Sequence, residues 1–222
     1  MTIMEAMNAR HSVRQYQSRP VDAPILEQLE AEIEACNRAS GLHVQLVANE
    51  PKAFNGLMAR YGKFSGVTQY IAMVGAKSAQ LEETCGYWGE RIVLKAQQLG
   101  LNTCWVGLTY QKVPGVFQVK SNEKLVIVIA LGYGVHQGTA HTSKSVDELS
   151  AVDGIAPSWF LSGVSAALLA PTAMNQQKFL LKYQDGKVKA KAGRGFYSKI
   201  DLGIVKCHFE IGAGKENVHW AE

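Results

Sequence analysis

Two uninterrupted apolar segments constrain the fold of this chain most strongly: YIAMVGA at Tyr70–Ala76 and KLVIVIALGYG at Lys124–Gly134. A continuous apolar run of this length is typical of a strand that is buried on both faces. Between them, apolar residues at core spacing from Ser78 to Gly100 predict the longest helix, which the glycine ends. Another short strand, Thr103–Leu108, follows that helix. The sequence therefore predicts a mixed central sheet flanked by helices.

The remaining segments mix helices and strands without a regular strand–helix–strand rhythm. Asp22 begins a helix, and Asp185-Gly186 between two alternating runs predicts a hairpin. Ser198 and Asp201 predict a capping box on the last helix. This mixture indicates the α+β class. We expect further strands at 42–47, 178–183, 187–192 and 217–222, and further helices at 22–36, 51–64, 158–170 and 200–211.

Length, charge and cysteine content exclude several classes of protein. At 222 residues the chain makes one large domain or two small ones. Its net charge of +4 is too small for the basic stripe of a nucleic-acid-binding protein, so we expect no nucleic-acid partner. We also expect no membrane association, because no long apolar run and no signal-peptide core are present. The four scattered cysteines favour reduced thiols in the cytoplasm.

One passage of the chain has a counterpart later in the sequence. The segment from Ile25 to Leu46 aligns with that from Phe160 to Leu181, and each reads as an apolar helix, a small polar end and a strand. Few positions are identical, among them Leu26 with Leu161. An internal duplication and a chance similarity therefore both remain open.

Several short motifs lack the context that their chemistry requires. GYGVHQG follows a strand but opens no helix, and GAGKE follows a helix without the P-loop spacing, so neither predicts a nucleotide site. Cys207, His208 and His219 have no further ligand at metal spacing, so we expect no metal site. The GxSxG motif is absent, which argues against a serine hydrolase.

The octapeptide ARHSVRQY, Ala9–Tyr16, combines two guanidinium groups with one small hydroxyl. An arginine matches a phosphate bidentately, and a serine hydroxyl can add a short hydrogen bond. In an extended segment Arg10, Ser12 and Arg14 project to the same side, which predicts a site for a phosphomonoester. A solvated charged turn is the alternative interpretation.

The stretch GYWGERIVLKAQQLGLNTCWVG, Gly86–Gly107, reads as a buried helix, a glycine stop and a short strand that ends in glycine. Gly107 would let a flat ligand approach the backbone, and the N–H groups from Val106 to Leu108 would face its edge. For most of the side chains in this stretch, a core helix and strand is a sufficient explanation.

A third stretch, APTAMNQQKF at Ala170–Phe179, places polar groups between an apolar helix and an apolar strand. The hydroxyl of Thr172 and the amides of Asn175 and Gln177 would suit the polar edge of a heterocycle. A capping or turn role is the alternative.

Together, RHSVRQY, LKAQQLGLNTCWVG followed by VIVIALGYG, and APTAMNQQ resemble the signatures of the FMN-dependent nitroreductase family, from Met4 to about Ala213. The resemblance implies that the first arginine and the serine serve the phosphate and ribityl end of FMN. The second arginine would approach the pyrimidine edge, and the strand end would lie along the isoalloxazine. The implied FMN-binding residues are Arg10, His11, Ser12, Arg14, Cys104, Trp105, Val106, Gly107, Leu108, His141, Ser143, Lys144, Pro171, Thr172, Asn175 and Gln177.

The chain departs from the usual pattern of that family in one respect. Typical members are homodimers in which an early Ser/Asn/Gln motif reaches the partner's flavin. Here the early copy is degraded, and the late copy, PTAMNQQ, resembles the functional motif. The chain therefore resembles a branch with two fused halves, about 1–150 and 151–222, within one nitroreductase-like domain, 1–222. We expect one FMN at the junction of the halves and an active monomer, with a homodimer as the alternative.

The resemblance implies an oxidoreductase in which flavin N5 carries the chemistry and no side chain is catalytic. NADH or NADPH would donate a hydride, and a nitroaromatic, a quinone or a similar small molecule would accept it. The alternatives are a flavin-binding sensor or store, another flavin reaction on the same fold, and a structural protein without flavin. We interpret Tyr61, Phe64, Tyr87 and Trp88 as core residues rather than as walls of a substrate site.

Overall fold

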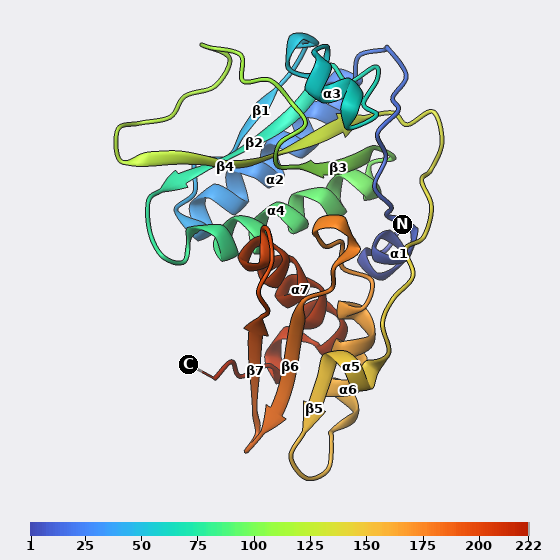
Figure 1. Ribbon diagram of the computed structural model, residues 1–222, viewed down its shortest axis with the longest axis vertical. Coiled ribbons are helices and arrows are strands. Elements are labelled where there is room, and N and C mark those ends of the chain that lie inside the picture. Colours follow the sequence, from blue (N-terminus) through green and yellow to red (C-terminus); the bar gives the residue numbers. More distant parts are fainter. Residues whose placement is uncertain (222) are drawn as a thin grey trace. The chain divides into compact units, whose positions relative to one another are not determined.

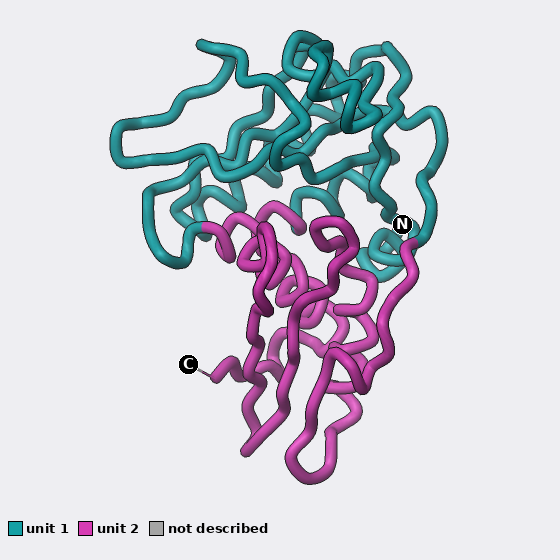
Figure 2. Tube along the Cα trace, in the orientation of Figure 1, with its two compact units in different colours: residues 1–81, 91–140 teal, residues 82–90, 141–222 magenta. Residues whose placement is uncertain are grey.

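The computed structural model describes residues 1–221 and confirms the α+β class. The chain forms two compact units (Figure 2), the first made of residues 1–81 and 91–140 and the second of residues 82–90 and those from 141 onward. Each unit has its own sheet, where the sequence predicts one mixed central sheet. The division into halves near residue 150 stays a prediction, and the second unit differs from the second half because it begins at His141 and includes residues 82–90.

The sheet of the first unit is antiparallel throughout (Figure 1). Its strand order is β1-β2-β4-β3, so the two apolar strands that the sequence identifies most clearly lie at its centre. In β2 every residue from Gln69 to Gly75 is buried, as an uninterrupted apolar run requires. The strands are β1 (Gln45–Val47), β2 (Gln69–Ala76), β3 (Asn102–Val106) and β4 (Glu123–Gly132).

The helices of the first unit follow the predicted apolar spacing. In α2 the side chains of Leu29, Ile33 and Cys36 are buried, and Gly41 ends the helix in the left-handed conformation with φ 71°. Asp22 occupies the N-cap position, but its carboxylate accepts a hydrogen bond from the hydroxyl of Tyr133 (2.8 Å) rather than from the helix. The helices are α1 (Ile3–Ala9), α2 (Ala23–Ser40), η1 (Lys52–Phe54), α3 (Leu57–Tyr61) and α4 (Leu81–Gln98), whose first half belongs to the second unit.

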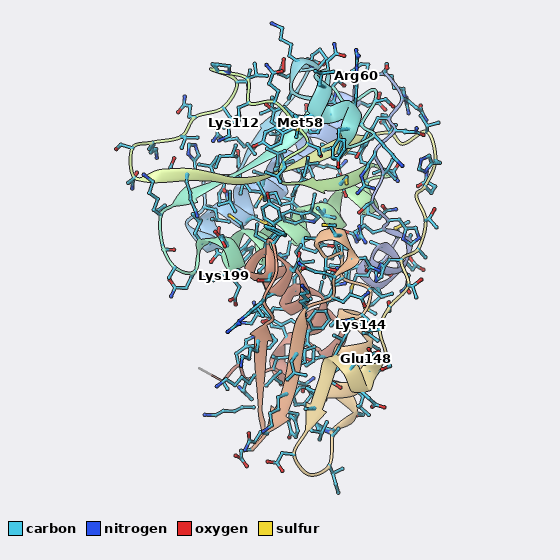
Figure 3. All side chains as sticks on the ribbon, in the orientation of Figure 1. Met58, Arg60, Lys112, Lys144, Glu148 and Lys199 are labelled. Carbon is cyan, nitrogen blue, oxygen red and sulfur yellow. The ribbon has the colours of Figure 1, made fainter. Side chains whose placement is uncertain are left out.

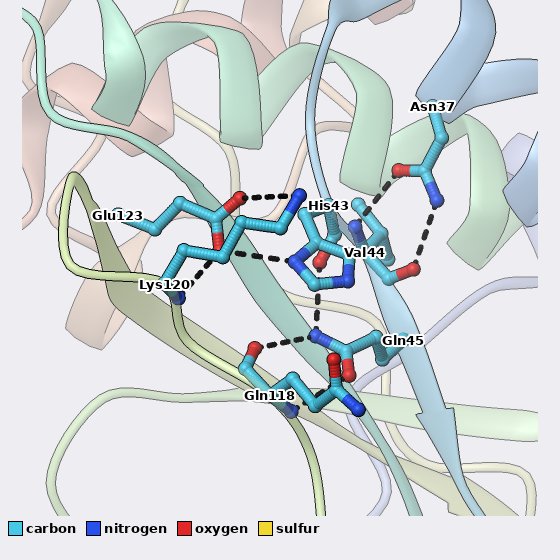
Figure 4. A network of polar contacts seen from close by, with 7 residues as sticks. All are labelled: Asn37, His43, Val44, Gln45, Gln118, Lys120 and Glu123. Carbon is cyan, nitrogen blue, oxygen red and sulfur yellow. Dashed lines mark hydrogen bonds and ion pairs between the residues drawn. The ribbon is translucent and has the colours of Figure 1, made fainter.

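A polar network fixes the passage from α2 into β1 (Figure 4). The side-chain amide of Asn37 donates to the carbonyl oxygen of Val44 (2.9 Å) and accepts from its N–H (2.8 Å), so it imitates a neighbouring strand. Next to it, Nδ1 of His43 bonds Oε2 of Glu123 (3.0 Å), which also accepts from the N–H of Lys120 (2.9 Å). These bonds tie the start of β1 to the start of β4.

The second unit has a three-stranded sheet in which β6 lies between β5 and β7, parallel to β5 and antiparallel to β7. The predicted hairpin is confirmed, with Asp185 (φ 50°) and Gly186 (φ 74°) both left-handed in its turn. The predicted last strand is reduced to a bridge between Val188 and Trp220. The elements are α5 (Val146–Leu149), β5 (Ser150–Val152), α6 (Ser158–Ala167), η2 (Ala173–Asn175), β6 (Phe179–Gln184), β7 (Lys187–Ala192), α7 (Ser198–Ala213) and η3 (Lys215–Asn217).

Close packing of helices forms the core of the second unit. Gly203 of α7 faces the backbone of Glu83 and Tyr87 in the first half of α4, where a Cβ atom would overlap with that backbone. His208, fully buried on α7, bonds Oε1 of Glu90 (2.9 Å) and the carbonyl oxygen of Ala166 (3.2 Å). Helix α7 is therefore held against both α4 and α6.

Two local predictions are wrong, the second because tertiary hydrogen bonds outweigh a local signal. Helix α4 begins at Leu81 rather than at Ser78, and with 18 residues it is only as long as α2. The capping box of Ser198 and Asp201 does not form: Tyr197 is the N-cap residue, and Asp201 is buried against residues 173–176.

The predicted duplication is not decided by the fold. Helix α2 leads to β1 and α6 leads to β6, which preserves the order of elements. However, β1 lies at the edge of its sheet, whereas β6 is the central strand of its own. The duplication therefore stays a prediction.

Within residues 1–221, no helix has both the length and the apolar character that crossing a membrane requires.

Candidate functional site

The N-terminal segment after α1 is extended and is fixed on both sides within the first unit. The N–H of Val13 donates to the carbonyl oxygen of Thr103 in β3 (3.0 Å), and the N–H of Tyr16 donates to that of Ser65 (2.9 Å). Further along, the N–H of Gln17 donates to the carbonyl oxygen of Tyr133 (2.8 Å). The predicted phosphate-binding residues thus lie on a rigid backbone rather than in a solvated turn.

Three of these residues act on one thiol. Burial raises the pKa of Cys104, while the charge of Arg14, a hydrogen bond from Ser12 and the charge of Arg10 oppose that shift. The bridge between Ser12 and Thr103 places the serine next to Cys104 in the chain pairing. Arg10 is only 3% exposed, so its guanidinium is taken out of bulk water, whereas Arg14 is exposed. A buried arginine beside a hydroxyl is a suitable donor set for an anion.

The other basic residues of this segment are placed by their neighbours. The guanidinium of Arg14 lies 5.9 Å from the ring centroid of Phe64. His11 lies against Gly138: a Cβ atom added to this glycine would lie 2.7 Å from the Cβ atom of His11. Both side chains therefore belong to the first unit, as does the segment that follows β4.

The end of β3 offers backbone rather than side chains. Cys104 and Val106 are buried, Trp105 and Gly107 are half-buried, and Leu108 is 70% exposed. The strand ends at Val106, so Gly107 and Leu108 lie beyond the ladder that pairs β3 with β4. Ser12 forms a parallel backbone bridge with Thr103, so the Arg10–Arg14 segment runs alongside β3 toward the end of that strand.

The second unit brings together the two remaining predicted segments. Nε2 of His141 and the hydroxyl of Ser143 both bond the carbonyl oxygen of Leu168, at 2.9 Å each. The backbone N–H of Lys144 donates to Oε1 of Gln177 (2.8 Å). The loop 141–144 is thus held to the segment that follows α6. The side chain of Lys144 is exposed (Figure 3) and adds to the lowering of the pKa of Glu148, which hydrogen bonds from Ser145 dominate.

The segment 171–177 is held by its own amides. Nε2 of Gln177 donates to the carbonyl oxygen of Thr142 (2.9 Å) and to Oδ1 of Asn175 (3.0 Å), and its N–H donates to Oγ1 of Thr172 (3.0 Å). Gln177 is 4% exposed, Asn175 is exposed, and Thr172 and Pro171 are half-buried. The side chain of Gln177 therefore shapes the segment, while Asn175 and Thr172 remain accessible.

Sequence reasoning missed one residue and misplaced another. Asp201 bonds the segment 173–176 from α7, and its place between the apolar residues Ile200 and Leu202 is the sequence signal that could have indicated a tertiary role. Tyr61 is 84% exposed on α3, so its assignment to the core is wrong, whereas Phe64 is buried as predicted.

A protein-family model described as "Putative TM nitroreductase" matches residues 2–213. The chain belongs to this family. The resemblance drawn from RHSVRQY and the two later motifs is thereby confirmed. No curated protein sequence matches the chain.

Several solved structures have folds similar to that of this nitroreductase-like chain. A structure described as a "putative nitroreductase" from Thermotoga maritima has 23% identity and a TM-score of 0.66, over 97% of this chain and 85% of its own. A "putative nitroreductase in complex with FMN" from Desulfovibrio desulfuricans has 18% identity and a TM-score of 0.53, over 67% of this chain and 95% of its own. A nitroreductase family protein from Streptococcus pneumoniae has 15% identity and a TM-score of 0.52, over 66% and 98%.

Proposed function

We propose that this nitroreductase-like chain is an FMN-dependent oxidoreductase that passes a hydride from NADH or NADPH to a small-molecule acceptor such as a nitroaromatic or a quinone. The observation that carries the proposal is the placement of the Arg10–Arg14 segment along β3, where Ser12 forms a bridge with Thr103 and the N–H of Val13 donates to the carbonyl oxygen of Thr103 (3.0 Å). Membership of the nitroreductase family and the FMN complex of the Desulfovibrio desulfuricans structure support it.

The chemistry of this cluster fits the phosphate of FMN. Arg10 supplies positive charge and is only 3% exposed, and Ser12 beside it supplies a hydroxyl. Burial strengthens a charge-assisted hydrogen bond, because less water competes for the donors. Burial also raises the pKa of the Cys104 thiol, so that the thiol is neutral and adds no charge repelling a phosphate.

The flavin, when bound, supplies the hydride chemistry at N5. In our proposal the backbone from Cys104 to Leu108 binds along its ring, with Trp105 at one side and Gly107 allowing close approach. Arg14 stabilises negative charge at the pyrimidine edge, and its position over Phe64 limits its mobility. His11 borders the ribityl side, next to Gly138.

Residues of the second unit are proposed to bind FMN as well. Lys144 has an exposed ammonium group for the phosphate, and Thr172 and Asn175 have polar groups for the ring edge. His141, Ser143 and Gln177 keep these two segments in shape through the bonds to Leu168 and Thr142, and together with Pro171 they are proposed to border the cofactor. We further propose that the chain acts as a monomer in the cytoplasm, in line with four cysteines that are all buried thiols.

The test begins with the absorbance of the purified protein, which we expect to be that of bound flavin. Anaerobic NADPH or NADH should bleach it, and a nitroarene or quinone should restore it. The double variant Arg10→Ala with Ser12→Ala should lose flavin on dialysis. Arg38→Ala is the matched control, because this arginine is exposed on α2 and pairs with the equally exposed Glu34 (3.6 Å). A colourless protein that does not bind added FMN would refute the proposal, and colour without bleaching would indicate a store or sensor.

A further inference from the structure

The segment that follows α6 adopts a backbone that most residues avoid. Met174 (φ 52°), Asn175 (φ 52°) and Gln177 (φ 46°) are all left-handed although none is glycine. Each such residue costs roughly 1 kcal/mol, so this conformation persists only where surrounding contacts hold it. Two of these three residues, Asn175 and Gln177, are predicted FMN-binding residues, and strained backbone of this kind concentrates at ligand sites.

Asp201 is the residue that holds this segment from α7. Its Oδ1 accepts from the N–H of Ala173 (2.9 Å), and its Oδ2 accepts from Nε2 of Gln176 (2.7 Å). The same Nε2 also donates to the carbonyl oxygen of Phe196 (2.8 Å). Asp201 is 3% exposed, so both of its oxygens are used in the interior. The carboxylate thus spans the left-handed Met174 and Asn175, binding the residues on either side of them.

Burying an ionised carboxylate at this position costs free energy. Burial raises the pKa of Asp201 to about 6, and the two hydrogen bonds only partly oppose that rise. Charged groups on the elements packed against α7 are paired elsewhere, Lys206 with Glu83 and His208 with Glu90, while the hydroxyl of Tyr87 bonds Glu210. Helix α6 carries no charged residue, and the lysines of β6 and β7 and Lys199 at the start of α7 are half-buried or exposed. An ionised carboxylate accepts from both donors with full strength, whereas protonation makes one of its oxygens a donor and a weaker acceptor.

We propose that Asp201 is a positioning residue whose ionised carboxylate keeps the 172–177 segment in its FMN-binding conformation. This inference rests on the proposed function. On protonation one carboxyl oxygen becomes a donor, and Ala173 or Gln176 loses its acceptor. The segment then relaxes, and the affinity for FMN falls as the pH decreases through the pKa of Asp201. This loss is on the acid side, because the binding-competent form is the deprotonated one.

The test compares FMN binding by the wild-type protein, Asp201→Asn and Asp201→Glu at about pH 7.5 and about pH 5. At the higher pH we expect Asp201→Asn to bind FMN about 10-fold more weakly, as one charge-assisted hydrogen bond implies. The ratio of the two dissociation constants should approach one at the lower pH. Using the ratio removes the titration of the FMN phosphate, which is common to both proteins. Asp201→Glu should restore part of the affinity, and Asp147→Asn, an exposed residue of α5, is the control.

A second readout needs no cofactor. Amide hydrogen exchange at Ala173 in the FMN-free protein should be about 10-fold faster in Asp201→Asn, and in the wild type it should lose the same protection at about pH 5. An Asp201→Asn protein that binds FMN like the wild type at both pH values would overturn the inference, as would a ratio that does not change with pH. A wild type that does not bind FMN would refute the proposed function instead. The exchange measurement would still test whether Asp201 holds the 172–177 segment. Should Asp201→Asn fail to fold, the pH dependence of exchange in the wild type decides.

Discussion

Replacing Asp201 with asparagine is expected to raise the unfolding free energy of the FMN-free protein, relative to the wild type, as the pH increases from acid to neutral. The pKa of Asp201 rises from 3.8 to about 6 in the folded protein, so the folded state binds its proton more tightly than the unfolded state. Stability therefore falls as the pH rises from about 3.8 to about 6, since the unfolded chain releases its proton first. A difference of about two pKa units at about 1.4 kcal/mol each gives about 3 kcal/mol.

Asparagine does not titrate, so this loss is absent from the variant. The changed hydrogen bonds to Ala173 and Gln176 add an offset that does not depend on pH. Urea unfolding of both proteins from about pH 4 to about pH 7 should thus show the difference in unfolding free energy, variant minus wild type, rising by about 2–3 kcal/mol. Asp147→Asn should show no such trend. A difference that stays constant with pH, or that falls, would refute the burial of an ionisable carboxylate at this position.

Three further predictions test contacts that hold the elements of each unit together. Glu123→Gln should make the melting temperature depend less on pH on the acid side. A hydrogen bond from His43 is the main cause that lowers the pKa of Glu123 in the folded protein. The ionised carboxylate therefore stabilises the protein above about pH 4.5, and this stabilisation is lost as the pH falls through the pKa of Glu123 in the folded state. Gly203→Ala should lower the unfolding free energy by about 2 kcal/mol or more, because its Cβ would overlap with the backbone of Glu83 and Tyr87; Ser165→Ala, on the exposed face of α6, should change it by less than about 0.5 kcal/mol. Asn37→Ala should cost about 1–3 kcal/mol in a denaturant titration, since two hydrogen bonds to Val44 are lost; an unchanged midpoint would contradict their role.

Most of the secondary structure could be predicted from the sequence, because its signals are local. The apolar run of β2, the Asp-Gly turn between β6 and β7, and Gly100 (φ 81°) just after α4 each act within a few residues. The division into two sheets could not be predicted, since it depends on which strands pair over long distances. Asp201 illustrates the same limit: its spacing from Ser198 resembles a local cap, but its partners lie 25 and 28 residues earlier.

The candidate site was predictable by residue type but not by role. Arg10, Ser12 and Arg14 could be singled out because a phosphate requires their donors, whereas their placement along β3 depends on the bridge between Ser12 and Thr103. For Gln177 the sequence indicates only a polar group near a ligand. Its burial and its bonds to Thr142 and Asn175 show that it also shapes the segment, while its contact with a flavin stays a prediction.

The central claim is that Arg10 and Ser12 bind the phosphate of FMN, and a comparison of FMN with riboflavin tests it most directly. Riboflavin has the same ring and ribityl chain without the phosphate, so the ratio of the two dissociation constants reports the phosphate alone. We expect the wild type to prefer FMN by about 100-fold, as two charge-assisted hydrogen bonds imply, and the Arg10→Ala, Ser12→Ala double variant to lose most of that preference. Arg38→Ala should retain it. A double variant that prefers FMN as strongly as the wild type would contradict the account.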